Sequence, residues 1–127
     1  MKQLKSILVV DDDIVAILTS QRIIKKLKLD VDLLTARHGK EALDIIREIC
    51  QGDQHLELIL LDINMPVMDG FELLEELKHS DDLSCALLRV VLVSSSTHYL
   101  DIARAKQYPV IDYLEKPLTA EKLSKFL

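Results

Sequence analysis

The hydrophobic residues of this chain form short uninterrupted runs that alternate with longer stretches of helical periodicity. A short apolar run between turn residues is typical of a strand buried on both faces. Apolar residues at i, i+3, i+4 and i+7 are typical of an amphipathic helix, and Ala42, Ile45, Ile46 and Ile49 give the clearest case. These patterns predict strands over residues 7–10, 31–35, 58–61, 89–93 and 111–114, and helices over 14–28, 42–49, 71–77 and 98–106, with a last helix capped by Thr119.

One apolar run leads directly into a lone carboxylate. Leu58–Leu61 is followed by Asp62, and Pro66 and Gly70 then break the pattern before the next helix. Strand and helix alternate five times in all, which favours a parallel sheet with helices on both faces. We therefore expect one α/β domain over residues 1–127, with a doubly wound five-stranded parallel sheet. In such sheets ligands bind outside the carboxyl ends of the strands, where Asp62 is expected.

Composition narrows the class of protein. The chain has 127 residues and a net charge of −5, which disfavours a broad nucleic-acid-binding surface. No apolar run approaches the ~18 residues of a membrane helix, and the N-terminus carries no signal-peptide pattern. Cys50 and Cys85 are isolated and are predicted to be free thiols, and none of the four His has metal-site spacing. These features together predict a cytoplasmic protein.

Polar residues end four of the five predicted strands. Asp11 and Asp12 end the first, Asp62 the third and Ser94 the fourth, and Lys116 follows the fifth. Because the carboxyl ends of parallel strands share one sheet edge, these side chains should lie together. Crowded carboxylates resist joint ionisation, and a hard cation such as Mg²⁺ relieves that conflict. A lysine and a hydroxyl nearby can donate to an oxyanion. The set predicts Mg²⁺-assisted phosphoryl transfer with a carboxylate nucleophile.

Each of these features also has an ordinary explanation when taken alone. The run Asp11–Asp13 could simply start a helix, since carboxylates favour helix N-termini. The segment Ser94–Thr97 could be a polar capping loop, and Lys116–Pro117 could be a turn. Only their joint position at one sheet edge favours a functional site.

Four segments, in this order, resemble the receiver domain of two-component response regulators, of the chemotaxis-regulator type. The resemblance covers nearly the whole chain and implies the flavodoxin-like strand order 2-1-3-4-5. The matching segments are Ile7–Asp13, Leu60–Gly70, Val93–Ser95 and Tyr113–Pro117.

The resemblance implies a role for each matching residue of the site. Asp62 corresponds to the phospho-acceptor, which attacks the phosphorus of a phosphohistidine. Asp12 corresponds to a direct Mg²⁺ ligand, Asp11 to one that acts largely through water, and Asn64 to a residue that offers its backbone carbonyl to the metal. Lys116 corresponds to the lysine that pairs with the acceptor and then with a phosphoryl oxygen.

Two further residues resemble the family's switch. Ser94 corresponds to the hydroxyl residue that binds another phosphoryl oxygen, at a position where Thr is also common. Tyr113 corresponds to the aromatic switch residue on the fifth strand, although plain packing at a sheet edge would also account for it. Asp13 is expected to start a helix rather than to bind metal.

The expected function is a phosphorylation-controlled signalling switch and not a multiple-turnover enzyme. It would phosphorylate and dephosphorylate only itself. The expected partners are a sensor histidine kinase or a histidine phosphotransfer protein and an unknown downstream protein. No direct contact with nucleic acid and no membrane insertion are expected, and whether phosphorylation drives dimerisation is left open by the sequence. The chain could be a stand-alone regulator or a receiver excised from a longer protein.

Three rival classes of protein would require residues that differ from those of this chain, or would not require its full set of site residues. A hydrolase of the haloacid-dehalogenase type also uses a strand-ending Asp, but it typically has a second Asp where this chain has Asn64. A flavin or nucleotide binder would need a glycine-rich phosphate loop, which the three Gly do not form. A receiver-like interaction module without phosphorylation would not need the intact set of site residues.

Overall fold

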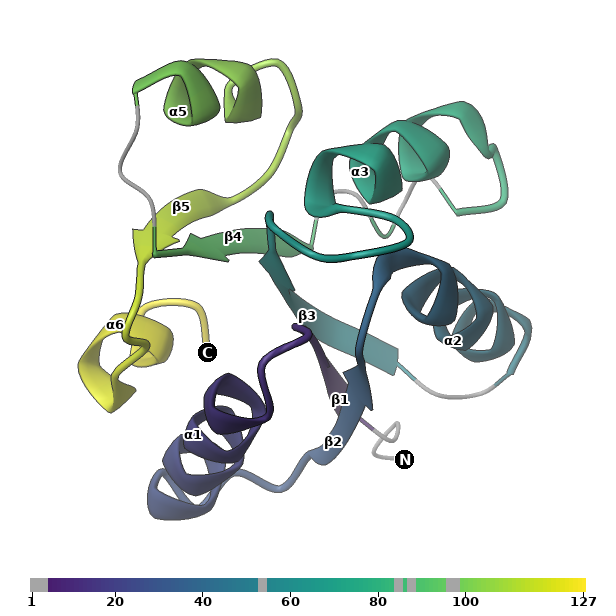
Figure 1. Ribbon diagram of the computed structural model, residues 1–127. Coiled ribbons are helices and arrows are strands. Elements are labelled where there is room, and N and C mark those ends of the chain that lie inside the picture. The colour runs from purple at the N-terminus through teal and green to yellow at the C-terminus, as the bar shows by residue number, and fades with distance from the viewer. Residues whose placement is uncertain (1–4, 53–54, 84–85, 87–88, 96–98) are drawn as a thin grey trace.

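The computed structural model describes residues 5–52, 55–83, 86, 89–95 and 99–127 (Figure 1). Its elements follow the predicted alternation of strand and helix. The strands are β1 (Lys5–Val10), β2 (Asp32–Ala36), β3 (His55–Asp62), β4 (Val90–Ser94) and β5 (Asp112–Glu115), and the helices are α1 (Ile14–Lys26), α2 (Gly39–Gln51), α3 (Gly70–His79), α5 (Tyr99–Ala105) and α6 (Ala120–Ser124).

The five strands form one parallel sheet in the order β2-β1-β3-β4-β5, as the resemblance implied. Strand β3 lies at the centre, between β1 and β4. In register, Val10 of β1 pairs with Leu61, and Asp62 pairs with Val93 of β4. The last residue of β3 and the residues that follow β1 therefore meet at one edge of the sheet.

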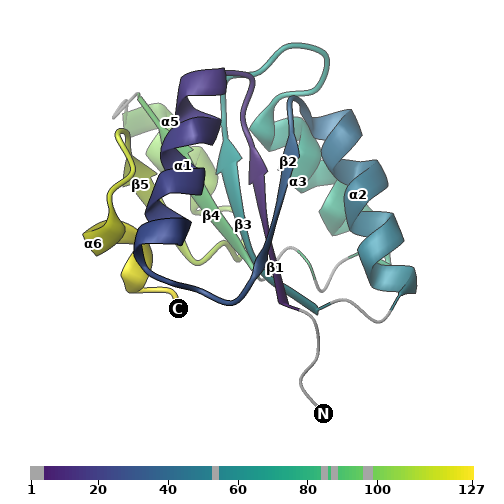
Figure 2. The ribbon, with the colours of Figure 1, turned by 90° about the horizontal axis from the view of Figure 1, so that it is seen from below.

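Helices cover both faces of the sheet (Figure 2). Helices α1 and α6 lie on one face, and α2, α3 and α5 lie on the other. Alternate strand residues supply the two cores, because successive side chains of a strand point to opposite faces. In β3, for example, Leu58 and Leu60 pack beneath α1, whereas Ile59 and Leu61 pack beneath α2 and α3. This accounts for the uninterrupted apolar runs of the sequence.

Element boundaries differ from the sequence expectations by a few residues. Helix α2 begins at Gly39 and not at Ala42, because the ring Nδ1 of His38 accepts a hydrogen bond from the N–H of Glu41 at 3.2 Å and caps the helix. Thr119 caps α6, as predicted. Cys85 and the expected start of a helix at His98 lie outside the described residues. None of the helices in the described part of the chain could span a membrane.

Candidate functional site

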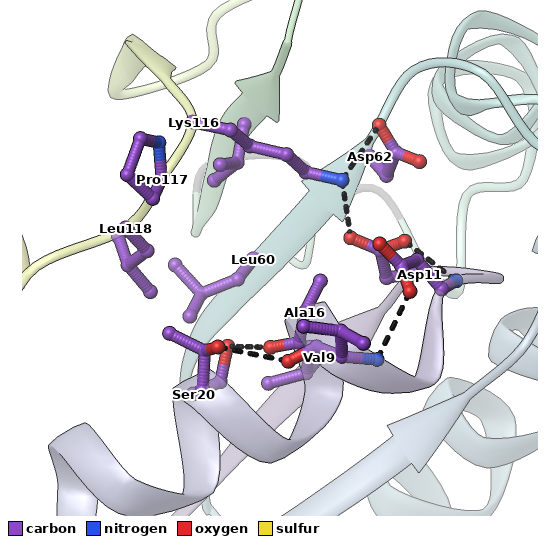
Figure 3. A pocket seen from close by; sticks show the side chains of 13 residues that line it. Val9, Asp11, Ala16, Ser20, Leu60, Asp62, Lys116, Pro117 and Leu118 are labelled. Carbon is purple, nitrogen blue, oxygen red and sulfur yellow. Dashed lines mark hydrogen bonds and ion pairs between the residues drawn. The ribbon is translucent and has the colours of Figure 1, made fainter.

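Polar residues at the ends of four strands lie at the carboxyl edge of the sheet, and Figure 3 shows three of them, Asp11, Asp62 and Lys116. The ammonium of Lys116, which follows β5, lies 2.7 Å from Oδ2 of Asp11 and 3.6 Å from Oδ1 of Asp62. Asp11, Asp62 and Ser94, the last residue of β4, are all buried. The structure thus brings Asp11, Asp62 and Lys116 into contact, as their positions at the strand ends predicted.

Asp12 joins Asp11 and Asp62 in a cluster of carboxylates. One oxygen from each of the three lies within 4.8 Å of the others. Asp11 and Asp62 are buried and Asp12 is exposed, so the cluster faces solvent on one side. Mg²⁺ binds one or two carboxylates and keeps several waters, so the oxygen-only donors and the open side of this cluster fit Mg²⁺. These three residues would hold the metal.

Burial and charge set the protonation of the site. Burial raises the pKa of Asp62 to about 6, and the Asp11 carboxylate adds to the rise. The charge of Lys116 and a hydrogen bond from the backbone N–H of Asn64 act in the opposite direction. Burial alone would lower the pKa of Lys116, but its hydrogen bond and ion pair with Asp11 leave that pKa raised. Lys116 is therefore a fixed positive charge beside a carboxylate that is mostly ionised at neutral pH.

The loop between β1 and α1 is held by short-range hydrogen bonds. Oδ1 of Asp11 accepts a hydrogen bond from the N–H of Asp13 at 2.9 Å. Asp13 is the N-cap of α1, since its own Oδ1 accepts from the N–H of Val15 at 2.9 Å. This agrees with its expected role as a helix-start residue. Asp11 thus faces the site, whereas Asp13, two positions further along the loop, starts the helix.

A residue that the sequence reasoning missed also holds this loop. The guanidinium of Arg37 donates a hydrogen bond to the backbone carbonyl of Asp12 at 3.1 Å. Arg37 directly follows β2, and the N–H of Asp11 bonds to the carbonyl of Ala36, the last residue of that strand, at 2.9 Å. Its place just beyond the end of a strand was the signal that could have identified it.

The loop after Asp62 is fixed by a close backbone approach and a helix cap. A Cβ on Gly70 would lie 2.6 Å from the backbone oxygen of Asp62, so only glycine fits there without a shift. Asp69 forms a capping box with Glu72 at the start of α3. Val67, in the loop between β3 and α3, has a φ of 67° and is 73% exposed. Such a φ is unusual for a β-branched residue and marks local strain.

Ser94 and the predicted switch residue Tyr113 are in contact. Their strands are adjacent, although Tyr113 is paired in register with Leu92. Burial raises the pKa of the Tyr113 phenol, and a side-chain hydrogen bond with Ser94 acts against that rise. The hydroxyl of Ser94 therefore links the end of β4 to the ring on the edge strand.

Comparison with known proteins assigns the family. A family model described as "Response regulator receiver domain" matches residues 7–127. The chain belongs to this family. It is similar to the probable methanogenesis regulatory protein FilR2 of Methanothrix harundinacea, with 34% identity over 120 residues that cover 94% of this chain and 76% of FilR2.

Similarity to other receiver domains varies in extent. The two-component response regulator ARR11 of Arabidopsis thaliana is 32% identical over 92% of this chain, which spans only 20% of the length of ARR11. Among solved structures, a two-component response regulator from Cytophaga hutchinsonii superposes with a TM-score of 0.83 at 28% identity, covering 98% of this chain and 95% of that one. The Mn²⁺-bound form of response regulator Rcp1 superposes with a TM-score of 0.76 at 31% identity, covering 95% of this chain and 87% of Rcp1.

Proposed function

We propose that this receiver domain is a phosphorylation-dependent switch of a two-component phosphorelay, and that Asp62 accepts the phosphoryl group in the presence of Mg²⁺. The observation that carries the proposal is the ion pair of Lys116 with Asp11 and Asp62 inside a cluster of three carboxylates. Because carboxylates held this close together repel one another, we expect the cluster to destabilise the metal-free fold, and binding of a metal would account for its presence.

The chemistry follows from the positions of the groups. An oxygen of Asp62 attacks the phosphorus of a phosphohistidine, the bond between phosphorus and the histidine nitrogen breaks, and that nitrogen leaves on the donor protein. Lys116 stabilises the charge on the phosphoryl oxygens, and the Ser94 hydroxyl donates to another of them. Bound Mg²⁺ would neutralise the carboxylates and the phosphoryl oxygens.

The metal ligands in this proposal are Asp11, Asp12 and Asp62, with the backbone carbonyl of Asn64. The carboxylates fit by their spacing. That the similar regulator Rcp1 has a Mn²⁺-bound form supports a divalent ion in this site. The phosphoryl donor would be a sensor histidine kinase or a histidine phosphotransfer protein, and a downstream protein would read the phosphorylated state.

The proposed activity is limited to the protein's own phosphorylation and dephosphorylation. Asn64 occupies the position at which a hydrolase of the dehalogenase type would have its acid/base carboxylate, and an amide cannot take up and release a proton in that role. We therefore expect one phosphoryl group per chain and no sustained turnover of small phosphate esters.

Intact-mass spectrometry tests the proposal. The full chain is incubated with acetyl phosphate and Mg²⁺, and in parallel with acetyl phosphate and EDTA. We expect a single phosphoryl group in the first sample and little in the second, because uncompensated carboxylates repel the donor.

A matched pair of variants locates the group. Asp62→Asn removes the nucleophile and should abolish labelling. Asp69→Asn makes the same change seven positions along the same loop, and because Asn also caps helices, α3 should persist and labelling should remain. Equal labelling of Asp62→Asn and the parent protein would refute the assignment.

A further inference from the structure

A cavity of about 310 Å³ opens beside Asp62 and follows α1 from Asp13 to Ser20 (Figure 3). Its volume falls at the small end of the range for sites that bind small molecules, ~300–1,000 Å³. The part of the cavity lined by Thr19, Ser20 and Leu118 lies outside the cluster of charged residues, and phosphoryl transfer at Asp62 does not need it. It is lined by Val9, Asp11, Asp13, Val15, Ala16, Thr19, Ser20, Leu60, Asp62, Val93, Lys116, Pro117 and Leu118.

Small side chains on α1 leave this space open. Ala16, Thr19 and Ser20 face the apolar residues Val9 and Leu60 of the sheet. The hydroxyl of Ser20 donates to the carbonyl of Ala16 at 3.0 Å, and the hydroxyl of Thr19 donates to the carbonyl of Val15 at 2.8 Å. Both hydroxyls thus already have a hydrogen-bond partner in their own helix, so a ligand in this part of the cavity would make mainly apolar contacts.

The end of the cavity at the carboxyl edge of the sheet is different in character. Three carboxylates, those of Asp11, Asp13 and Asp62, line it together with the single ammonium of Lys116. Lys116 is already paired with Asp11 and Asp62, so negative charge remains in excess. This end therefore favours a cation and disfavours an anion, while the walls between α1 and the sheet favour an apolar group.

We propose that this cavity binds small amphipathic cations, with an aryl or alkyl tail beneath α1 and an ammonium head at the carboxylates. Because the head would occupy carboxylates that we assign to the metal, the cation and Mg²⁺ would exclude one another. Such a ligand would hold the receiver domain in an unphosphorylated state. The binding itself does not depend on the proposed function, whereas this inhibitory effect does.

Three probes with the same ring test the binding. 2-Phenylethylamine is titrated into the ¹⁵N-labelled full chain without Mg²⁺, and 2-phenylethanol and phenylacetate serve as neutral and anionic controls. We expect the amine to shift amide signals of residues 13–20 and of Leu118, and to bind about tenfold more tightly than the alcohol. Shifts confined to other regions, or equal binding of phenylacetate, would overturn the proposal.

A cavity-filling variant gives an independent test. Ala16→Leu should fill the space beneath α1 and weaken amine binding about tenfold, with little effect on Mg²⁺ affinity. Gln21→Leu adds the same side chain at an exposed position of α1 outside the cavity and should bind the amine like the parent. Unchanged amine binding by a folded Ala16→Leu variant would refute the site. If that variant does not fold, the residues whose amide signals shift in the NMR titration of the parent protein decide where the amine binds.

Competition with the metal tests the inhibitory half. Saturating Mg²⁺ should weaken amine binding, and the amine should slow phosphorylation by acetyl phosphate. If the amine binds but neither effect appears, the competition is refuted. If the parent protein accepts no phosphate even without amine, the proposed function fails, while the titration in the absence of Mg²⁺ still decides the binding site.

Discussion

The carboxylate of Asp62 should destabilise the metal-free fold at neutral pH, and Asp62→Asn should remove that effect. The pKa of Asp62 rises from 3.8 to about 6 on folding, so the folded protein holds this proton more tightly than the unfolded chain. At about 1.4 kcal/mol for each tenfold change in proton affinity, the full penalty is about 3 kcal/mol. Solvent and salt screen part of this penalty, so we expect Asp62→Asn to raise the free energy of unfolding by about 1–2 kcal/mol.

The sign of this effect with pH follows from the raised pKa. Below pH 3.8, the ordinary pKa of this carboxyl in the unfolded chain, Asp62 is protonated in both states and does not lower the stability of the fold. Stability is lost as the pH rises toward 6, and above 6 the penalty is complete. Asn has the same shape and no charge, so the variant should be more stable than the parent at about pH 7.5, with the difference reduced to roughly a third near pH 4.5.

Urea denaturation in EDTA at the two pH values measures the difference. The variant and the parent are compared at each pH, so the titration of most other groups cancels. An equal difference at both pH values would show that the change acts through packing and not through charge. A less stable variant at pH 7.5 would show that Lys116 already compensates Asp62 fully, and the reasoning would be refuted.

Other perturbations test the metal, the switch and the strained loop. Asp12→Ala should leave the melting temperature of the metal-free protein unchanged or raise it. The variant should lose most of the stabilisation that Mg²⁺ gives the parent, which is about 2.7 kcal/mol for a ligand at a hundred times its Kd. Equal stabilisation of both proteins by Mg²⁺ would place the metal elsewhere. Ser94→Ala should still accept phosphate but lose the NMR shift of Tyr113 on addition of beryllofluoride, because the Ser94 hydroxyl is hydrogen-bonded to the Tyr113 phenol. A shift equal to that of the parent would refute the coupling. Val67→Gly should raise stability by about 1 kcal/mol, since relief of strain at positive φ exceeds the entropic cost of glycine, whereas Val67→Ala should not. Thermal melts that rank Ala above Gly would contradict this.

The sheet and most of the site could be predicted because both follow from periodicity. Buried parallel strands are uninterrupted apolar runs, so the polar residue that ends each run marks the carboxyl edge of the sheet. Asp11, Asp62 and Lys116 were identified in this way, and the structure places them in contact. Their placement depends on the backbone topology and little on side-chain detail.

Features that depend on side-chain reach or local backbone geometry could not be predicted. Arg37 contacts Asp12 across 25 positions of sequence by means of a long flexible side chain. His38 caps α2 through a ring nitrogen, although imidazole is not a preferred cap. The positive φ of Val67 runs against its residue type. The cavity arises from the small size of Ala16 and Ser20. Hydrophobic periodicity indicates which face of a helix they lie on, but it does not show the space that their small side chains leave.

Site mapping of the phosphoryl group tests the central claim most directly. After incubation with acetyl phosphate and Mg²⁺, borohydride reduces an aspartyl phosphate to homoserine, and tandem mass spectrometry of peptides locates the reduced residue. We predict homoserine at position 62, dependent on Mg²⁺ and absent without phosphodonor. Homoserine at another aspartate, or a phosphoryl group on a serine or threonine, would contradict the assignment of Asp62 as the phospho-acceptor.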